Sequence, residues 1–208
     1  MRLIWNVTKL SAGDIWDELL YLLIFNAIWV LGSLFILPWP FLTFGLIFTA
    51  YDIGQGKAIN LSTFFVRPAP FWKQAYSWGA INLVAGFLMW FNFNFYGNIQ
   101  TSWAATMQIV FLAIILLWSI WQLLTLPMYP RLEEPGFKLA MRNAAVVFGR
   151  YPLAVFALTI IVVVLLFIAA IFPIFAFFGV GAFIAVVTNR LVGTIVEREL
   201  EREADDNE

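Results

Sequence analysis

The chain has 208 residues, of which 62% are hydrophobic and 12% are charged, and its mean hydropathy is +0.87. A soluble domain of this length needs a polar coat around its core, so the composition predicts a single-domain, all-helical polytopic membrane protein. The 12 basic and 13 acidic residues give no nucleic-acid-binding surface, and the absence of Cys and His excludes disulfides, thiol chemistry and the commonest metal ligand.

The N-terminal segment precedes the first apolar run. It contains Arg2 and Lys9 together with three acidic residues at 14, 17 and 18, and no small-residue cleavage site follows the apolar run. We interpret it as part of a retained first helix and not as a signal peptide.

Six apolar stretches are candidates for membrane spans, because a bilayer core of roughly 30 Å needs about 20 residues of helix. Prolines 38 and 40 in the stretch LPWPFLTFG separate the first two, and Pro173 with the small residues 179–182 separates the last two. Pro40 suits the first position of a helix, where no N–H is needed, so we expect a tight hairpin between spans one and two. The predicted spans cover 19–37, 40–56, 77–96, 104–127, 152–172 and 176–197.

The basic residues test this count, since Lys and Arg flank spans mainly on the cytoplasmic side. Three connections, 38–40, 92–103 and 172–180, carry no charge. Six spans therefore place every basic residue on one side, and both termini are predicted to be cytoplasmic. A re-entrant loop over 38–51 that returned to the outer side would put Lys57, Arg67 and Lys73 outside, so a crossing is favoured.

Two cytoplasmic connections, 61–76 and 136–149, combine aromatic and basic residues in patterns typical of amphipathic interfacial helices. Their basic side chains form a candidate surface for a protein partner or anionic lipid: Arg67, Lys73, Arg142 and Arg150. The acidic tail, 197–208, is predicted to continue the sixth span into water, with partner docking as the alternative.

Within the predicted spans we find no charged residue near the bilayer middle, which lowers the expectation of an ion-coupled carrier or voltage sensor. Intramembrane polar residues most often hydrogen-bond across helix contacts, but four of them could instead line a solute path. These candidates are Asn26, Thr43, Asn82 and Gln122.

Several short motifs carry a family resemblance. They are Asn26-x-x-Trp29, Leu37-Pro38 with Thr43-x-Gly45, Thr49-Ala50-Tyr51, and Phe71-Trp72-Lys73-Gln74. In these motifs, and more loosely over 138–152, the chain resembles the YesL-like family of bacterial integral membrane proteins, but Trp39-Pro40 departs from the small β-branched residues usual there. The resemblance implies a multi-pass protein of the bacterial cytoplasmic membrane with an accessory role beside carbohydrate uptake systems.

The sequence therefore predicts a non-enzymatic accessory or scaffold protein without cofactor or metal. Its expected partners are the lipid bilayer and other membrane proteins, such as an ATP-driven sugar importer, or a second copy of the chain. The alternative is a small permease or channel for a neutral or amphipathic solute. An intramembrane enzyme would need clustered carboxylates or a nucleophile with a base, and the sequence offers neither.

Overall fold

The computed structural model describes residues 2–205, and this part of the chain is almost entirely helical and contains no strand. The predicted all-helical class is confirmed. Residues 206–208 of the predicted acidic tail lie outside the described residues. The elements in chain order are α1 (Arg2–Asp17), α2 (Leu19–Ser33), α3 (Trp39–Gly54), α4 (Leu61–Val66), η1 (Ala69–Phe71), α5 (Trp72–Gly97), α6 (Ser102–Thr125), η2 (Leu126–Arg131), α7 (Phe137–Arg150), α8 (Pro152–Ile171), α9 (Pro173–Phe178) and α10 (Val180–Asp205).

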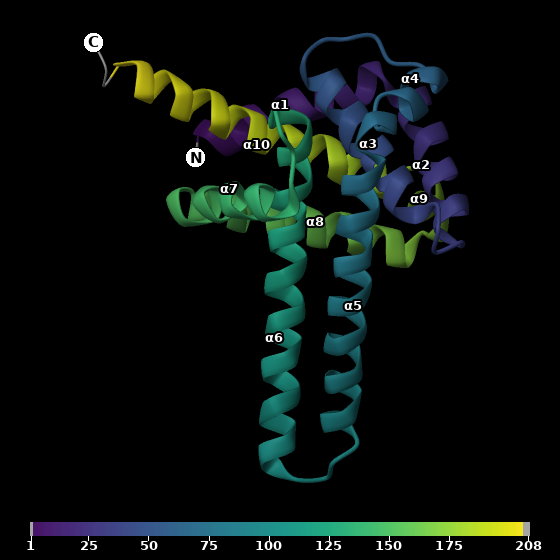
Figure 1. Ribbon diagram of the computed structural model, residues 1–208, viewed down its shortest axis with the longest axis vertical. Coiled ribbons are helices and arrows are strands. Elements are labelled where there is room, and N and C mark those ends of the chain that lie inside the picture. Colours follow the sequence, from purple (N-terminus) through teal and green to yellow (C-terminus); the bar gives the residue numbers. More distant parts are fainter. Residues whose placement is uncertain (1, 206–208) are drawn as a thin grey trace.

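A two-helix hairpin, α5 and α6, dominates the shape of the molecule. Figure 1 shows the two helices side by side along the long axis, projecting well beyond the other elements. Of residues 80–121, Ala104 alone is buried. The hairpin therefore leaves most of its apolar circumference open over the greater part of its length, and it is held to the rest of the protein only at its base.

The remaining helices form a body around α3. This helix is buried without interruption from Leu42 to Ala50, because its neighbours α2, α5 and α10 cover it on several sides. On α10, the buried positions extend from Val180 to Ile195, and α1 and α8 also pack on this helix. The core thus lies in the body and not in the hairpin.

The connection between α2 and α3 lies where the sequence has its two closely spaced prolines. The α2 helix stops at Ser33, and Pro38 precedes α3, so that Pro40 falls in the first turn, where a missing N–H costs nothing. A short connection therefore joins α2 to α3 at the predicted prolines, with α3 beginning one residue before Pro40. The Pro40 ring packs against Gly79 of α5 so closely that a Cβ on Gly79 would lie 2.3 Å from Pro40 Cγ.

The described helices provide three candidate spans by length and apolar composition, namely Ser102–Arg131, α8 and α10. A fourth is possible if α1 and α2, which meet at 86°, together make one broken span. At 15 and 16 residues, α2 and α3 are short for full crossings. The sequence predicts six spans, whereas the described helices provide three, or four with the broken pair. In Figure 1, α7 and α10 run across the direction of the α5–α6 hairpin, so the helices do not form one parallel bundle.

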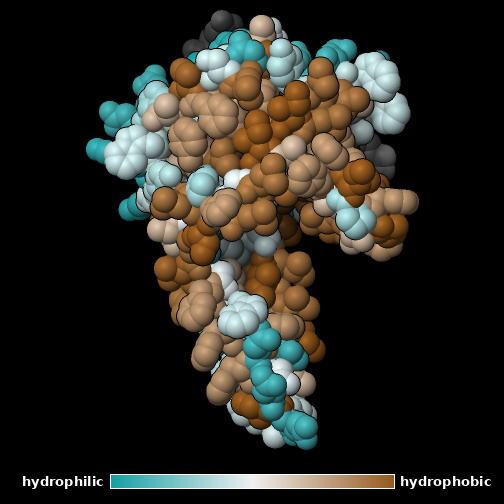
Figure 2. Space-filling view, turned by 90° about the vertical axis from the view of Figure 1, so that its right-hand side faces the viewer, coloured by the Kyte–Doolittle hydropathy of each residue, from teal (hydrophilic) through white to brown (hydrophobic). Residues whose placement is uncertain are grey.

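The surface is mainly apolar, as lipid contact requires. Figure 2 shows hydrophobic residues over the body and the upper hairpin, and hydrophilic residues at the tip of the hairpin and at the opposite end of the body. Two polar ends separated by an apolar belt are consistent with a membrane protein.

We expect the contact between Pro40 and Gly79 to be essential for holding the body on the hairpin. Gly79→Leu should lower the free energy of unfolding by about 1–3 kcal/mol, because the side chain would overlap the proline ring. Gly86→Leu on the same helix is the matched control, since nothing lies within 4 Å of its Cβ position. Thermal unfolding in detergent measures both, and equal melting temperatures for the two variants would contradict the packing.

Candidate functional site

Asn26 joins α2 to the break between α9 and α10. Its Nδ2 donates to the backbone carbonyls of Ala176 and Phe177, at 3.1 and 2.7 Å, and its Oδ1 accepts from the backbone N–H of Ala182 at 2.9 Å. The side chain is fully buried. One asparagine thus satisfies three backbone groups that the broken helix leaves without helical partners, which is a connecting role.

Thr43 connects α2 to α3. Its hydroxyl donates to the Trp39 carbonyl within its own helix and accepts from Trp29 Nε1 at 3.0 Å. Thr43 also borders a small groove of about 160 Å³ between α2, α3, α6 and α10, but the lining of that groove is almost entirely apolar.

Asn82 and Gln122 lie together at the base of the α5–α6 hairpin. Gln122 Oε1 accepts from Trp78 Nε1 at 2.9 Å and from Asn82 Nδ2 at 3.3 Å, while Asn82 Oδ1 accepts from Trp118 Nε1 at 3.0 Å. The network joins α5 to α6 through side-chain hydrogen bonds. Gln122 Nε2 is buried and has no hydrogen-bond partner among the described residues.

The four candidate polar residues therefore fall into three separate helix contacts. Asn82 and Gln122 share one network, Thr43 pairs with Trp29, and Asn26 caps the broken helix. Of the five cavities of the described residues that we compared, the groove beside Thr43 is lined by one of the four, and the other four cavities are lined by none of them.

Arg67 is held by a buried carboxylate. Asp52, on α3, is 4% exposed and accepts from Arg67 Nε at 2.7 Å and Nη2 at 2.5 Å, with Lys57 Nζ 3.8 Å from Oδ1. This bidentate hydrogen bond raises the pKa of Arg67 above its ordinary value. The Arg67 guanidinium is thus paired with a carboxylate of the same chain, although its side chain remains partly exposed.

The other three basic candidates are exposed. Lys73 Nζ lies 5.6 Å from the centroid of the Trp72 ring, and Arg142 projects from α7. Arg150 forms an ion pair with Glu199 of α10, and Glu199 also accepts from the Tyr151 hydroxyl, which raises the pKa of Tyr151. Only part of the predicted basic surface is therefore available to an external partner.

Two arginines that the sequence did not single out make internal contacts. Arg190 forms an ion pair with Asp14 of α1 and donates to the Gly54 carbonyl at 3.0 Å. Arg131 donates to the Pro127 carbonyl and to both oxygens of Asn189, and its guanidinium lies 4.9 Å from the centroid of the Tyr51 ring.

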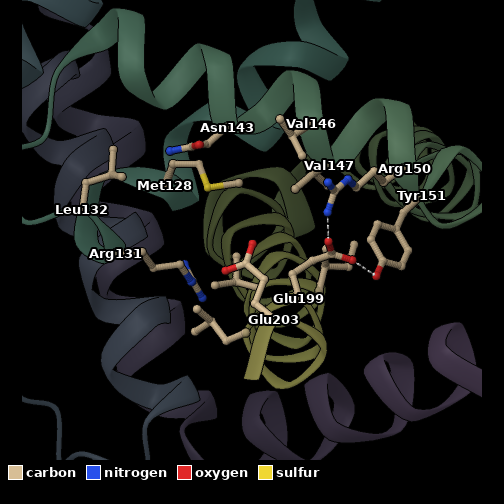
Figure 3. Close-up of a pocket in the computed structure, with 13 residues that line it drawn as sticks. Met128, Arg131, Leu132, Asn143, Val146, Val147, Arg150, Tyr151, Glu199 and Glu203 are labelled. Carbon is tan, nitrogen blue, oxygen red and sulfur yellow. Dashed lines mark hydrogen bonds and ion pairs between the residues drawn. The ribbon is translucent and has the colours of Figure 1, made fainter. Parts of the chain in front are cut away.

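A cavity of about 290 Å³ opens between η2, α7 and α10 (Figure 3). Arg131 points into it from one side, and the Arg150–Glu199–Tyr151 cluster closes the other, with Glu203 also on its lining. The rest of the wall is mainly apolar, from residues such as Met128 and Val147. The charged residues on the lining are two arginines and two glutamates, so the cavity has no excess of one charge.

The described residues contain no group of three or more carboxylates placed to bind a metal ion. Comparisons of the chain with models of protein families, with curated proteins and with solved structures find no match.

Asn26 should be essential for the connection between α2 and the α9–α10 break. Asn26→Leu keeps the volume but leaves two carbonyls and one N–H without their partner, which should cost about 2–4 kcal/mol of stability. Asn94→Leu is the control, because Asn94 is exposed and donates only to the Trp90 carbonyl of its own helix. A melting temperature for Asn26→Leu equal to that of the control would show that the buried contacts are dispensable.

Asp52→Asn tests the contact between Asp52 of α3 and Arg67. The amide cannot accept two charge-assisted hydrogen bonds from Arg67, so we expect a loss of about 1–2 kcal/mol and faster proteolysis of the 55–70 segment. Glu133→Gln, at an exposed position, is the control. Identical proteolysis patterns for both variants would indicate that Asp52 does not anchor this segment.

Proposed function

We propose that the protein is a non-enzymatic integral membrane accessory or scaffold subunit that binds other membrane proteins through the α5–α6 hairpin. The observation that carries the proposal is the hairpin itself, whose residues 80–121 are exposed or half-buried except at Ala104. Two helices that project with so little support from their own chain offer a long surface for helix packing inside a bilayer. Transmembrane association depends on such side-by-side packing.

The distribution of the polar residues also supports a scaffold more than a permease. A solute path needs polar groups that face one continuous cavity. Here Asn26, Thr43, Asn82 and Gln122 each satisfy partners within helix contacts. These contacts account for the four residues without a transported solute.

The partner class and the location follow from the family resemblance. Because the motifs around Asn26, Thr43 and Trp72 resemble the YesL-like family, we propose a carbohydrate uptake system as the partner and the bacterial cytoplasmic membrane as the location. The basic residues of the connections support an orientation with both termini in the cytoplasm. Six spans with an outer hairpin between the first two is one topology that satisfies this distribution.

Purification from the native host in a mild detergent tests the proposal. We expect a membrane transport subunit to be recovered in near-stoichiometric amount with the wild-type chain. Val84→Trp on α5 and Leu117→Trp on α6 should each reduce this recovery at least fivefold, because a bulkier side chain on an exposed face blocks close helix packing.

Val163→Trp is the matched control, since Val163 is exposed to a similar degree on α8, outside the hairpin. All three variants should keep the melting temperature of the wild type. Recovery of the chain alone, or equal recovery of the transport subunit with all three variants, would contradict the proposal. Recovery of a second copy of the chain in place of a transport subunit would replace the proposed partner with self-association.

A further inference from the structure

The connection between α2 and α3 has an exposed apolar tip. Its residues are Leu34, Phe35, Ile36 and Leu37, each between 68% and 75% exposed. No polar side chain interrupts them. The connection between α5 and α6, by contrast, consists of Asn98, Ile99, Gln100 and Thr101, as expected for a loop in water.

The contacts of α3 with α5 fix how far this tip reaches along the hairpin. The rings of Phe48 and Phe71 are tilted against each other with centroids 4.9 Å apart, and nearer the tip the ring centroids of Trp39 and Trp78 are 5.2 Å apart. The two helices therefore run antiparallel, with the start of α3 beside Gly79.

The rise per residue of an α-helix gives the position of the tip along α5. From Trp72 to Gly79, α5 rises about 10 Å, and from Gly79 to Gly97 it rises about a further 27 Å. The α2–α3 tip thus stops far short of the polar end of the hairpin. If α5 and α6 cross a hydrocarbon core of roughly 30 Å, the tip lies inside that core.

The backbone of the tip is suited to an apolar environment. Pro38 and Pro40 have no N–H to satisfy. The Phe35 N–H donates to the Gly32 carbonyl, and the Leu42 N–H donates to the Pro38 carbonyl, both at 3.0 Å. These features reduce the number of backbone donors that need water, which is the main obstacle to placing a turn in lipid.

We infer that α2 and α3 form a re-entrant hairpin that penetrates the bilayer from the side of Lys57 and Lys73 and turns back at partial depth, with its tip in contact with lipid acyl chains. The hairpin starts and ends on the same side, so every basic residue keeps the side that six spans would give it. A re-entrant hairpin replaces two of the predicted crossings and leaves Lys57, Arg67 and Lys73 on the side predicted for them. The inference depends on membrane insertion of α5 and α6, and not on the identity of any partner.

The chain has no Cys, so single-cysteine variants can be labelled without further engineering. Ile36→Cys reports on the tip, Asn98→Cys on the α5–α6 connection and Lys57→Cys on the segment after α3. Each variant is expressed in cells and treated with a membrane-impermeant maleimide, before and after permeabilisation and finally in denaturing detergent.

We expect Asn98→Cys to be labelled in intact cells and Lys57→Cys only after permeabilisation. Ile36→Cys should stay at least tenfold less reactive than both until the protein is denatured. Labelling of Ile36→Cys from outside at the rate of Asn98→Cys would show a full crossing and overturn the inference. Labelling at the rate of Lys57→Cys would place the tip in cytoplasmic water and overturn it as well.

A nitroxide at residue 36 separates lipid contact from burial in protein. In purified protein reconstituted into phospholipid vesicles, we expect strong relaxation by oxygen, which concentrates in the bilayer interior, and weak relaxation by a water-soluble nickel chelate. Weak relaxation by both reagents would indicate that protein covers the tip and would contradict its contact with acyl chains.

Discussion

The close contact between Pro40 and Gly79 determines how the body sits on the hairpin. Because Gly79 has no side chain, the proline ring at the start of α3 can lie against the α5 backbone. The aromatic contacts of α3 with Phe71 and Trp78 follow from the same antiparallel register. This register leaves most of α5 and α6 beyond the reach of α3, so the hairpin has to find other contacts in lipid or in another protein.

Polar side chains act mainly as connectors in this protein. Asn26 satisfies the backbone where α9 gives way to α10, and Gln122 with Asn82 links the two helices of the hairpin. Charged contacts extend the same principle to α1 and to the 55–70 segment, through Arg190 with Asp14 and Arg67 with Asp52. Each contact is costly to leave unsatisfied in apolar surroundings, and together they specify which helices meet.

Much of the fold could be predicted because hydrophobicity and prolines mark helices directly. The run around Pro38 and Pro40 indicated the α2–α3 connection, and the apolar segments indicated where the long helices occur. Sequence patterns report the local environment of a helix, but they contain no direct signal for its crossing angle or its depth. The short α2 and α3 helices were therefore interpreted as full spans, although their lengths allow a partial-depth hairpin.

The contacts of the candidate residues were less predictable, because their partners are distant in the sequence. Asn26 and Gln122 were recognised as intramembrane polar residues, but their partners are backbone groups and tryptophans distant in sequence. Arg67 carries a charge that suggested an external surface, and only the fold brings it to Asp52. Tertiary pairing of this kind depends on helix packing, which no local pattern specifies.

Disulfide trapping in native membranes tests the register of α3 on α5 most directly, because a natural chain without Cys gives no background. The double variant Pro40→Cys with Gly79→Cys should form an intramolecular disulfide rapidly on mild oxidation. Pro40→Cys with Phe95→Cys should remain reduced, since the two positions are separated by most of the hairpin. The opposite pattern would show that α3 begins beside the far end of α5, as in a six-span bundle, and would contradict the arrangement described.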